Sequence, residues 1–403
     1  MSRQHHAPHA LLIVENLPVP FDRRVWAEAK ALRADGWRVS VVAPRHAGSR
    51  WHERLDGIDV YRYPLLVAGA GVLAHAVEYA IALPASATLA VLVHLRHRVD
   101  VVHMANPPDF LFALAAFLRS LGAAAIFDQH DPAPELYLAQ GGRRGGLIDR
   151  FLRWCERRTY RTADVVIATN DSLRGLATGR GGVDPARVVV VRSSVDPSRT
   201  YRVAPDPSLK TGREYLVVYL GVMGPQDGLD LFVRMAREMA DRLPGRVRFY
   251  AVGDGSERAA AEALARSLGL AEDMAFPGRL SDEEVRTVLS TADVAVGPDP
   301  KNGFNELCTM NKTLEYMAMG VPVVSFDLAE TRVSAADAAV YARPNEAVDL
   351  ARRAIEVLTE PDRGAARGRA GQARIAGPLS WANSVNELRR AYELALTNRA
   401  ERR

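Results

Sequence analysis

The sequence predicts two α/β domains, each with a parallel sheet covered by helices on both faces. Short apolar runs alternate with segments of helical apolar spacing in both halves of the chain. Between the halves, residues 195–213 are rich in Pro, Ser and charge and show no periodicity. The 403 residues suffice for two hydrophobic cores. Strands separated by helices imply right-handed crossovers, so we expect two Rossmann-like domains facing each other across a cleft.

The first half repeats a strand-then-helix order. After an apolar run, Val25, Trp26, Ala29 and Leu32 follow at helical spacing, and Gly36 ends that helix. The expected strands are 10–15, 38–43, 99–103, 123–128, 164–169 and 187–191. The expected helices are 22–35, 109–121, 146–161 and 172–178.

The second half restarts the same order after the linker. Its expected strands are 216–221, 247–253, 274–277, 293–297, 321–326 and 339–342. Its expected helices are 228–242, 257–268, 282–292, a short one carrying Lys312 and Glu315, and one from 347. A last helix over 380–396 has Trp381, Leu388 and Tyr392 on one side, and we expect it to pack back on the first domain. The predicted domains are 1–200 with 379–403, and 214–378.

The amino-acid composition is that of a globular protein and limits the cellular setting. Hydrophobic residues at 48% and charged residues at 25% are normal for a globular chain. Two cysteines, Cys155 and Cys308, provide neither a disulfide framework nor a zinc site, so a cytoplasmic setting is expected. No apolar signal core precedes Leu11, and export is not expected. The net charge of +4 is modest, and we expect no nucleic-acid partner.

Two features of the sequence concern membrane binding. Arginines crowd one segment, at positions 143, 144, 150, 153, 157, 158 and 161. They form either a solvated helix face or a contact with anionic lipid. The region from Leu65 to Leu95 is largely apolar, but His75, Glu78, Pro84 and His94 interrupt it, so its runs fall short of the ~20 residues of a spanning helix. We expect helices on a membrane surface or a buried helical hairpin, and no transmembrane span.

Loops after the strands of the second domain suit a nucleotide. Ligands of such sheets bind beyond the carboxyl ends of the strands. The loop from Gly221 through Gly224 to residue 228 lets backbone amides approach a diphosphate at a helix N-terminus. Gly253 and Arg279 lie in two similar turns. In the stretch 302–327, a carboxylate on a short helix is placed to accept hydrogen bonds from a diol.

The first domain offers a histidine between two acids. His130 follows the strand 123–128 and is flanked by Asp128 and Asp131. It can accept or donate a proton or bind a sugar hydroxyl, and its neighbours tune its pKa. His94 and His103 are predicted to be structural. The acids alone are weak support for Mg²⁺, and no metal is expected.

Arg23 and Arg24 stand at the start of the helix 22–35, where cations oppose the helix dipole. A bound anion explains them, and an ion pair between Arg24 and Glu28, four residues on, explains them equally well.

Several stretches together resemble one family. VGDGSE, FPGR, ADVAVGPD, NKTLEYMAMGVPVVSFD and the final SW…Y helix are similar to those of the family-4 glycosyltransferases of the GT-B fold. The resemblance covers nearly the whole chain. It implies transfer of a sugar from a nucleotide-diphosphate donor with retention of configuration, and no metal or other cofactor.

The resemblance also assigns roles on the donor side. Glu315 matches the second glutamate of the family's E-x7-E motif, which holds the ribose. Leu307 stands where the first glutamate is expected, and Glu306, one residue away, is the catalytic candidate that a shifted loop would present in its place. Lys312, after Asn311, resembles a phosphate or sugar contact.

The family's loop after the first donor-domain strand carries an Arg and a Lys, and here those positions are Val222 and Asp227. A leaving diphosphate needs positive charge or oriented dipoles. Lys312, Arg332 and the loop amides are then expected to do more of this work, helped by Arg23 and Arg24. His130 corresponds to the histidine placed near the sugar's 6-hydroxyl.

The resulting hypothesis is a retaining, metal-independent hexosyltransferase. A non-catalytic partner of the same fold is the alternative, favoured by Val222, Asp227 and Leu307. Sugar-nucleotide epimerisation needs a cluster of acids and bases that the sequence does not show. A lipid-linked acceptor at the inner membrane face, as in cell-surface polysaccharide assembly, fits the apolar and arginine-rich segments, and a small-molecule acceptor stays open.

Overall fold

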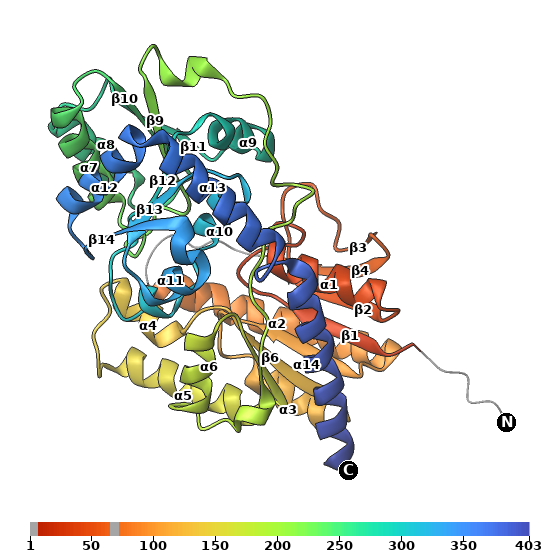
Figure 1. The fold of residues 1–403 in the computed structure, drawn as a ribbon. Coiled ribbons are helices and arrows are strands. Elements are labelled where there is room, and N and C mark those ends of the chain that lie inside the picture. The colour runs from red at the N-terminus through yellow and green to blue at the C-terminus, as the bar shows by residue number, and fades with distance from the viewer. Residues whose placement is uncertain (1–6, 65–71, 403) are drawn as a thin grey trace. The chain divides into compact units, whose positions relative to one another are not determined.

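The computed structural model describes residues 7–64 and 72–402. The chain divides into two compact units (Figure 1). The first comprises Met1–Pro134, Arg143–Arg192 and Ser384–Arg403, and the second comprises Glu135–Gly142 and Ser193–Asn383. Within the described residues each unit contains one sheet.

The first unit is built on a sheet with the order β3-β4-β2-β1-β5-β6-β7-β8. Its strands are β1 (His9–Ile13), β2 (Arg38–Pro44), β3 (His52–Leu55), β4 (Ile58–Tyr63), β5 (Val101–Ala105), β6 (Ala124–Gln129), β7 (Val165–Ala168) and β8 (Val188–Val190). Among the described strands, only the edge strand β3 pairs antiparallel, with β4. The sequence predicted this parallel sheet, but it missed the β3–β4 hairpin.

Helices cover both faces of this sheet. They are α1 (Arg23–Ala34), α2 (Val72–His97), α3 (Phe112–Ser120), α5 (Leu147–Thr162), α6 (Asp171–Thr178) and α14 (Trp381–Glu401). Successive side chains of a strand point to opposite faces. Leu12 of β1 accordingly packs with α1 and α14, while Leu11 and Ile13 pack with α2 and α3. The return of the last helix, labelled α14 in Figure 1, to the first domain is confirmed, because its residues Leu388 and Tyr392 lie in this core.

Helix α2 differs from the prediction. It is one continuous helix of 26 residues with Pro84 inside it, and residues 65–71 lie outside the described chain. Thr88 donates a hydrogen bond to the Pro84 carbonyl, and Ala82, Ala90 and Val93 are buried against the sheet. Packing of this face outweighs the backbone hydrogen bond that proline cannot donate. Among the described helices, α2 alone is long and apolar enough to cross a membrane by length and composition, although core helices pass that test too.

The second unit holds a fully parallel sheet in its described residues, with the order β11-β10-β9-β12-β13-β14. Its strands are β9 (Tyr215–Leu220), β10 (Val247–Val252), β11 (Met274–Gly278), β12 (Val294–Gly297), β13 (Val323–Phe326) and β14 (Ala339–Ala342). The change of direction between β9 and β12 is a topological switch point, where ligands of such sheets bind.

The helices of the second unit are α7 (Leu229–Arg242), α8 (Arg258–Ser267), α9 (Asp282–Thr291), α10 (Asn311–Ala318), α11 (Ala329–Ala335), α12 (Ala347–Thr359) and α13 (Pro361–Ala376). Helices α7, α8 and α12 contribute to the core on one face, and α9, α10 and α13 to the core on the other. A short helix, α4 (Ala133–Ala139), spans the boundary between the two units in sequence.

Residues 193–213 pack against the second unit. Val195 is buried in its core, and the backbone amides of Val203 and Asp206 donate to Ser290 and Thr291 at the end of α9. Two Rossmann-like sheets are therefore present, as the sequence predicted.

Candidate active site

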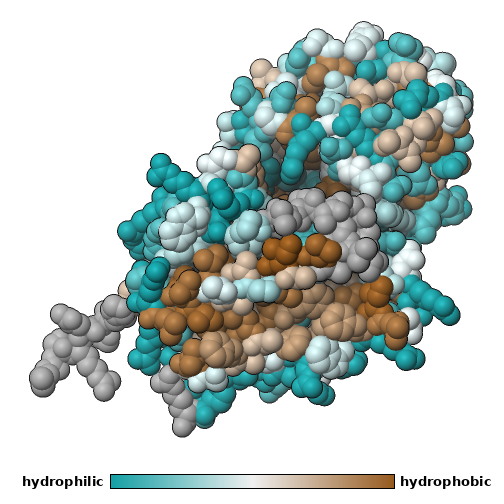
Figure 2. Space-filling view, turned by 180° about the vertical axis from the view of Figure 1, so that it is seen from behind, coloured by the Kyte–Doolittle hydropathy of each residue, from teal (hydrophilic) through white to brown (hydrophobic). Residues whose placement is uncertain are grey.

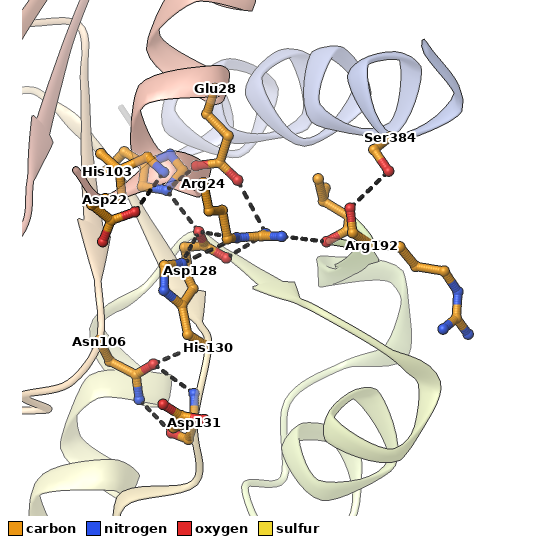
Figure 3. Close-up of polar contacts among 12 residues, drawn as sticks. Asp22, Arg24, Glu28, His103, Asn106, Asp128, His130, Asp131, Arg192 and Ser384 are labelled. Atoms are coloured by element: carbon orange, nitrogen blue, oxygen red, sulfur yellow. Dashed lines mark hydrogen bonds and ion pairs between the residues drawn. The ribbon is translucent and has the colours of Figure 1, made fainter. Parts of the chain in front are cut away.

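His130 lies just beyond the carboxyl end of β6, and Asn106 fixes the turn that carries it. The Asn106 Oδ1 atom accepts from the amides of His130, at 2.6 Å, and Asp131, at 3.2 Å. Its Nδ2 atom donates to the Asp131 carbonyl and to Asp109 (Figure 3). The backbone of residues 130 and 131 is thus held by one buried amide side chain.

The imidazole of His130 is held by Asp128, two residues earlier. Its Nε2 atom lies 2.6 Å from Oδ2 of Asp128. Arg24 of α1 contacts the same carboxylate, with Nη2 3.0 Å from Oδ1 and Nε 3.2 Å from Oδ2. The His130 side chain keeps 17% of its surface exposed, whereas Asp128 is fully buried.

A second layer of buried groups lies behind Asp128. Glu28 pairs with Arg24 at 3.0 Å, and His103 of β5 has its Nε2 atom 3.5 Å from Glu28 and 3.4 Å from Asp128. The Tyr392 hydroxyl of α14 forms a hydrogen bond with Nδ1 of His103 at 3.0 Å. Figure 3 shows these groups converging from α1, β5 and β6. Interior charges in contact with one another shift each other's protonation strongly.

Burial and neighbouring charge set the pKa values of this cluster in different directions. Burial raises the pKa of Asp128, but Arg24 and His130 outweigh it and hold that pKa well below its usual range. Burial lowers the pKa of His130, but the Asp128 carboxylate outweighs it and the pKa is raised. Burial, then Asp128, raise the pKa of Glu28 to about 7, against the opposing effect of Arg24.

Glu28, His103 and Asp128 also form the one group of three potential metal ligands found in the described residues. Both carboxylates already contact the Arg24 guanidinium at 3.0 Å. This guanidinium already offsets the negative charge of both carboxylates, which disfavours a second cation beside them, so these residues fit a metal poorly.

The arginines at the start of α1 have different surroundings. Arg24 is nearly buried and contacts Glu28, Asp128 and the Val191 carbonyl, so the ion pair with Glu28 is the alternative observed. Arg23 is exposed. Of the two histidines predicted to be structural, His103 is buried as described, and His94 accepts from the amide of Val99.

In the second unit, two loops approach closely at the carboxyl ends of β9 and β10. Gly253 has φ +133°, and a Cβ there would lie 1.8 Å from the Gly221 carbonyl oxygen. Gly228 precedes α7 with φ +67°, and its Cβ would lie 2.1 Å from the Pro298 carbonyl. Side chains are excluded at both positions, which leaves backbone amides lining the start of α7.

Lys312 of α10 lies beside these loops but is already paired. Its Nζ atom is 2.5 Å from Asp299, 3.4 Å from Asp227 and 4.9 Å from the centre of the Tyr219 ring. Burial would lower the pKa of Lys312, but Asp299 outweighs it and holds that pKa well above its usual range. Burial raises the pKa of Asp227 even though Lys312 opposes this. One ammonium therefore compensates two carboxylates where the family has an Arg and a Lys.

The remaining residues of the 302–327 stretch are arranged as follows. Glu315 is half-buried on α10, three residues after Lys312, and Asn311 is exposed in the first turn. The Glu306 carboxylate accepts from the Ala329 amide at the start of α11 and lies 3.5 Å from Lys301. Leu307 is half-buried at the end of the same 3-10 turn. In this conformation, Glu306 is occupied as a helix cap.

Two further predicted donor-side arginines lie at the surface. Arg279 is exposed after β11. Arg332 of α11 is 55% exposed, forms an ion pair with Asp327 and lies 4.3 Å from the Tyr341 ring centre. Gly224 lies in the loop before α7 and donates its amide to Asp227.

Sequence reasoning missed several contributors. Asn106 has no motif of its own, and Asp128 was named only as a neighbour of His130. The pairing of Lys312 with Asp227 and Asp299 was not foreseen, although the acid at position 227 pointed to a partner of opposite charge.

Comparison with known proteins identifies the family of both units. The profile of a glycosyl transferase 4-like domain matches residues 22–193, and that of glycosyl transferases group 1 matches residues 214–360. Together they span most of both units. The chain belongs to the family-4 glycosyltransferases of the GT-B fold.

Individual relatives of this glycosyltransferase are distant. A 2-deoxystreptamine glucosyltransferase from Streptomyces kanamyceticus is 28% identical over 62% of the chain and 64% of its own length. A D-inositol 3-phosphate glycosyltransferase from Geodermatophilus obscurus is 31% identical over 60% of the chain and 54% of its own length. The chain thus spans less than two thirds of these curated relatives.

Solved structures share the fold across the whole glycosyltransferase. Sucrose-phosphate synthase from Thermosynechococcus elongatus superposes with a TM-score of 0.78 at 18% identity, covering 96% of this chain and 98% of that one. HepE from Anabaena in complex with UDP-glucose gives 0.69 at 14% identity, covering 96% and 99%. The predicted fold class and family are confirmed.

Proposed function

We propose that the chain transfers a hexose from a nucleotide-diphosphate donor to an acceptor hydroxyl, with retention of configuration and without a metal. The observation that carries this proposal is the meeting of the Gly221–Gly228 loop, the Gly253 turn and α10 at the switch point of the second sheet. Such a switch point beside a helix N-terminus suits a nucleotide.

The donor contacts follow from this arrangement. Glu315 accepts from the two ribose hydroxyls, since a carboxylate can bind a diol through both oxygens. The diphosphate lies against the first amides of α7, where oriented N–H groups and the helix dipole favour an anion. Gly221, Gly224 and Gly253 leave the backbone accessible. Arg279, Arg332 and Asn311 are the exposed candidates for further donor contacts.

In the proposed reaction the acceptor hydroxyl approaches the anomeric carbon from the face that the diphosphate leaves. The anomeric carbon passes through an oxocarbenium-like state, and the departing phosphate takes the acceptor proton. Few side chains supply positive charge to the leaving diphosphate. With Val222 and Asp227 in place of cations, and Lys312 compensating two acids, amide dipoles must carry most of the stabilisation of the leaving group.

A panel of nucleotide sugars tests the donor activity through release of free nucleotide. Glu315→Ala and His130→Ala should each lower turnover at least about tenfold, as expected when a group that contacts the substrate is removed. Glu360→Ala, at an exposed position of the second unit, and His52→Ala, at a partly exposed position of the first, serve as matched controls. Turnover unaffected by both site variants would remove these residues from the site. Product anomeric configuration, read from NMR coupling constants, tests retention.

A non-catalytic partner of the same fold is the second candidate, and the pairing of Lys312 favours it. A donor site whose lysine is already compensated binds diphosphate weakly. Calorimetry with nucleoside diphosphates separates the two candidates: binding without turnover of any sugar donor supports the partner, and turnover excludes it.

A contact with an anionic membrane surface is proposed for one face of the first unit. Exposed apolar side chains gather there on and beside three helices: Val77, Leu92 and Leu95 on α2, Phe117 on α3 with Leu121 just after it, and Leu147, Phe151 and Trp154 on α5. Figure 2 shows an extended hydrophobic area on this side of the molecule. Such a large apolar area on a folded unit marks an interaction site.

Charge favours lipid as the occupant of this face. Arg150, Arg157 and Arg158 are exposed on α5 beside Phe151 and Trp154. Aromatic and arginine side chains mixed on one helix are typical of a membrane interface, where the apolar groups insert and the cations meet phosphate. A lipid-linked acceptor would be within reach of a protein held in this way, at the inner face of the membrane.

Vesicle sedimentation tests this contact. Leu92→Glu with Phe117→Glu should abolish binding to vesicles rich in phosphatidylglycerol. Val348→Glu, an equally exposed apolar position in the second unit, should leave binding unchanged. Two results would contradict the membrane contact: equal vesicle binding by the unmodified chain, the double variant and Val348→Glu, or no vesicle binding by the unmodified chain. A small-molecule acceptor would then be the remaining alternative.

A further inference from the structure

We propose that Asp128 is a positioning residue that fixes a proton on Nε2 of His130, so that the imidazole meets its ligand as a cation donating through Nδ1. The inference rests on the proposed function only in taking His130 as a ligand contact. It assigns His130 the role of a charged hydrogen-bond donor, whereas the sequence left donor and acceptor roles open.

The first step is the location of the proton. At 2.6 Å, Nε2 of His130 and Oδ2 of Asp128 must share a hydrogen. Arg24 donates to both oxygens of Asp128, which keeps that carboxylate ionised and accepting. The hydrogen therefore belongs to Nε2. The Nε hydrogen of Arg24 is within reach of both this nitrogen, at 3.1 Å, and Oδ2 of Asp128, at 3.2 Å, and with Nε2 protonated only the carboxylate oxygen can accept it.

The second step is a count of charge in the cluster. Asp128 carries one negative charge, Glu28, whose pKa is raised to about 7, carries a second once it is ionised, and Arg24 carries one positive charge. Nε2 of His103 faces both carboxylates, at 3.5 and 3.4 Å, so the ring directs its hydrogen there and Nδ1 accepts from Tyr392. Once Glu28 is ionised, one positive charge is missing. A second proton on His130 supplies it, because His130 lies nearer to Asp128 than His103 does.

The third step concerns the remaining groups that face His130. Asp22, the N-cap of α1, adds a further negative charge, and Arg24 adds the opposing positive charge. The raised pKa of His130 shows that the carboxylates prevail over burial and Arg24 together. No hydrogen bond among the described residues engages Nδ1 of His130. This nitrogen is left to meet a ligand.

A cationic donor selects a different ligand atom than a base does. It binds an oxygen that carries lone pairs or negative charge, such as a sugar hydroxyl accepting a hydrogen bond or a phosphate oxygen. It cannot take a proton from an acceptor hydroxyl. This agrees with a reaction in which the departing phosphate takes that proton.

Histidine titration by NMR tests the inference without substrate, on full-length protein labelled at its histidines. A His130→Gln variant identifies the signal. We expect the pKa of His130 to lie above 6.5 and to fall by about 1–3 units in Asp128→Asn, which keeps the shape and removes the charge. Asp164→Asn serves as control, since Asp164 is a buried aspartate paired with Arg119 at the opposite end of the same sheet. It should leave this pKa unchanged.

Two results would overturn the inference: a His130 pKa below 6.5 in the unmodified chain, or one that Asp128→Asn and Asp164→Asn shift equally. One equivalent of tightly bound metal in the purified protein, lost in Asp128→Asn, would also overturn it. Circular dichroism excludes unfolding as the cause of a shift. If Asp128→Asn does not fold, Arg24→Gln replaces it. The pKa of His130 in that variant must then differ from the pKa of His130 in Asp164→Asn.

The pH dependence of turnover separates this inference from the proposed activity. If the chain is an active transferase, kcat/KM should fall as pH rises through the pKa of His130, and in Asp128→Asn this alkaline limb should move to lower pH. A fall on the acid side instead would identify a base. An NMR shift in a chain that turns over no donor would leave the inference standing and refute the proposed activity.

Discussion

Removal of the Lys312 ammonium should destabilise the second unit more than any comparable surface change. Lys312→Met keeps most of the side-chain volume and leaves Asp227 and Asp299 without their shared cation. The side chains of the three residues are 9%, 14% and 3% exposed, so water cannot replace the ammonium. Breaking a buried pair by removing one partner costs about 3–5 kcal/mol. We expect a loss of this size in the free energy of unfolding at pH 7.

The loss should depend on pH in a defined direction. Burial already raises the pKa of Asp227 while Lys312 opposes this, so without the lysine that folded-state pKa lies further above its unfolded value. A raised carboxyl pKa contributes stability at low pH that disappears as pH rises through it. The deficit of Lys312→Met should therefore be small near pH 4–5 and complete at pH 7–8. Adding Asp299→Asn should recover part of it at pH 7, because one buried charge is removed.

Urea denaturation followed by circular dichroism measures the loss, and hydrogen exchange of β9 and α10 locates it in the second unit. Lys301→Met is the matched control, since its pair with Glu306 is 46% and 30% exposed and contributes at most about 1 kcal/mol. Equal losses in Lys312→Met and Lys301→Met, or a deficit independent of pH, would refute the reasoning.

Three further predictions concern single side chains. Gly253→Ala should cost more than about 3 kcal/mol of unfolding free energy, because its methyl group would overlap the Gly221 carbonyl at a φ that L-residues rarely adopt. Urea denaturation measures this loss, and a loss below about 1 kcal/mol would contradict the close approach. Tyr392→Phe should cost about 1–3 kcal/mol in the same assay, because it leaves Nδ1 of buried His103 without its donor, and no loss would show that the bond is not formed. Burial, and to a lesser extent Glu78, raises the pKa of Glu15 to about 8. The free energy of unfolding of the unmodified protein should therefore fall by up to about 1.4 kcal/mol per pH unit between pH 5 and pH 8. Glu15→Gln should remove this pH dependence.

The alternation of strands and helices was predictable because buried parallel strands are nearly continuous apolar runs that helical segments separate. The β3–β4 hairpin was missed for a different reason. Its half-buried edge strand, HERL, is mostly polar, and the signal was the turn instead. Asp56 and Gly57 both have positive φ, the pair favoured in two-residue hairpin loops.

The continuity of α2 could not be predicted from local rules. Pro84 marks an interruption in sequence, and only the packing of the surrounding residues on the sheet decides that the helix continues through it. The same limit applies to Arg24. An ion pair with Glu28 and a bound anion were equally compatible with spacing, because the partner Asp128 lies 104 residues away in the chain.

The donor side shows what a motif can and cannot specify. The roles of Glu315 and Lys312 were predicted from the resemblance of their helix to the family motif. That Asp227 and Asp299 share the ammonium depends on two loops that only the folded sheet brings together. The position of Glu306 at the start of α11 depends likewise on a distant amide.

The route of the chain constrains the order in which this protein matures on the ribosome. Leu388, Ala391, Tyr392 and Ala395 complete the core of a unit whose other residues end at Arg192. The second unit intervenes, roughly 190 residues that take about 10–40 seconds to translate at typical rates. Throughout that interval the nascent first sheet lacks the cover of α14, and its apolar face is exposed to other chains. Emergence of α14, which follows the second unit in the chain, should therefore end the interval in which the nascent first unit is most prone to associate with other chains.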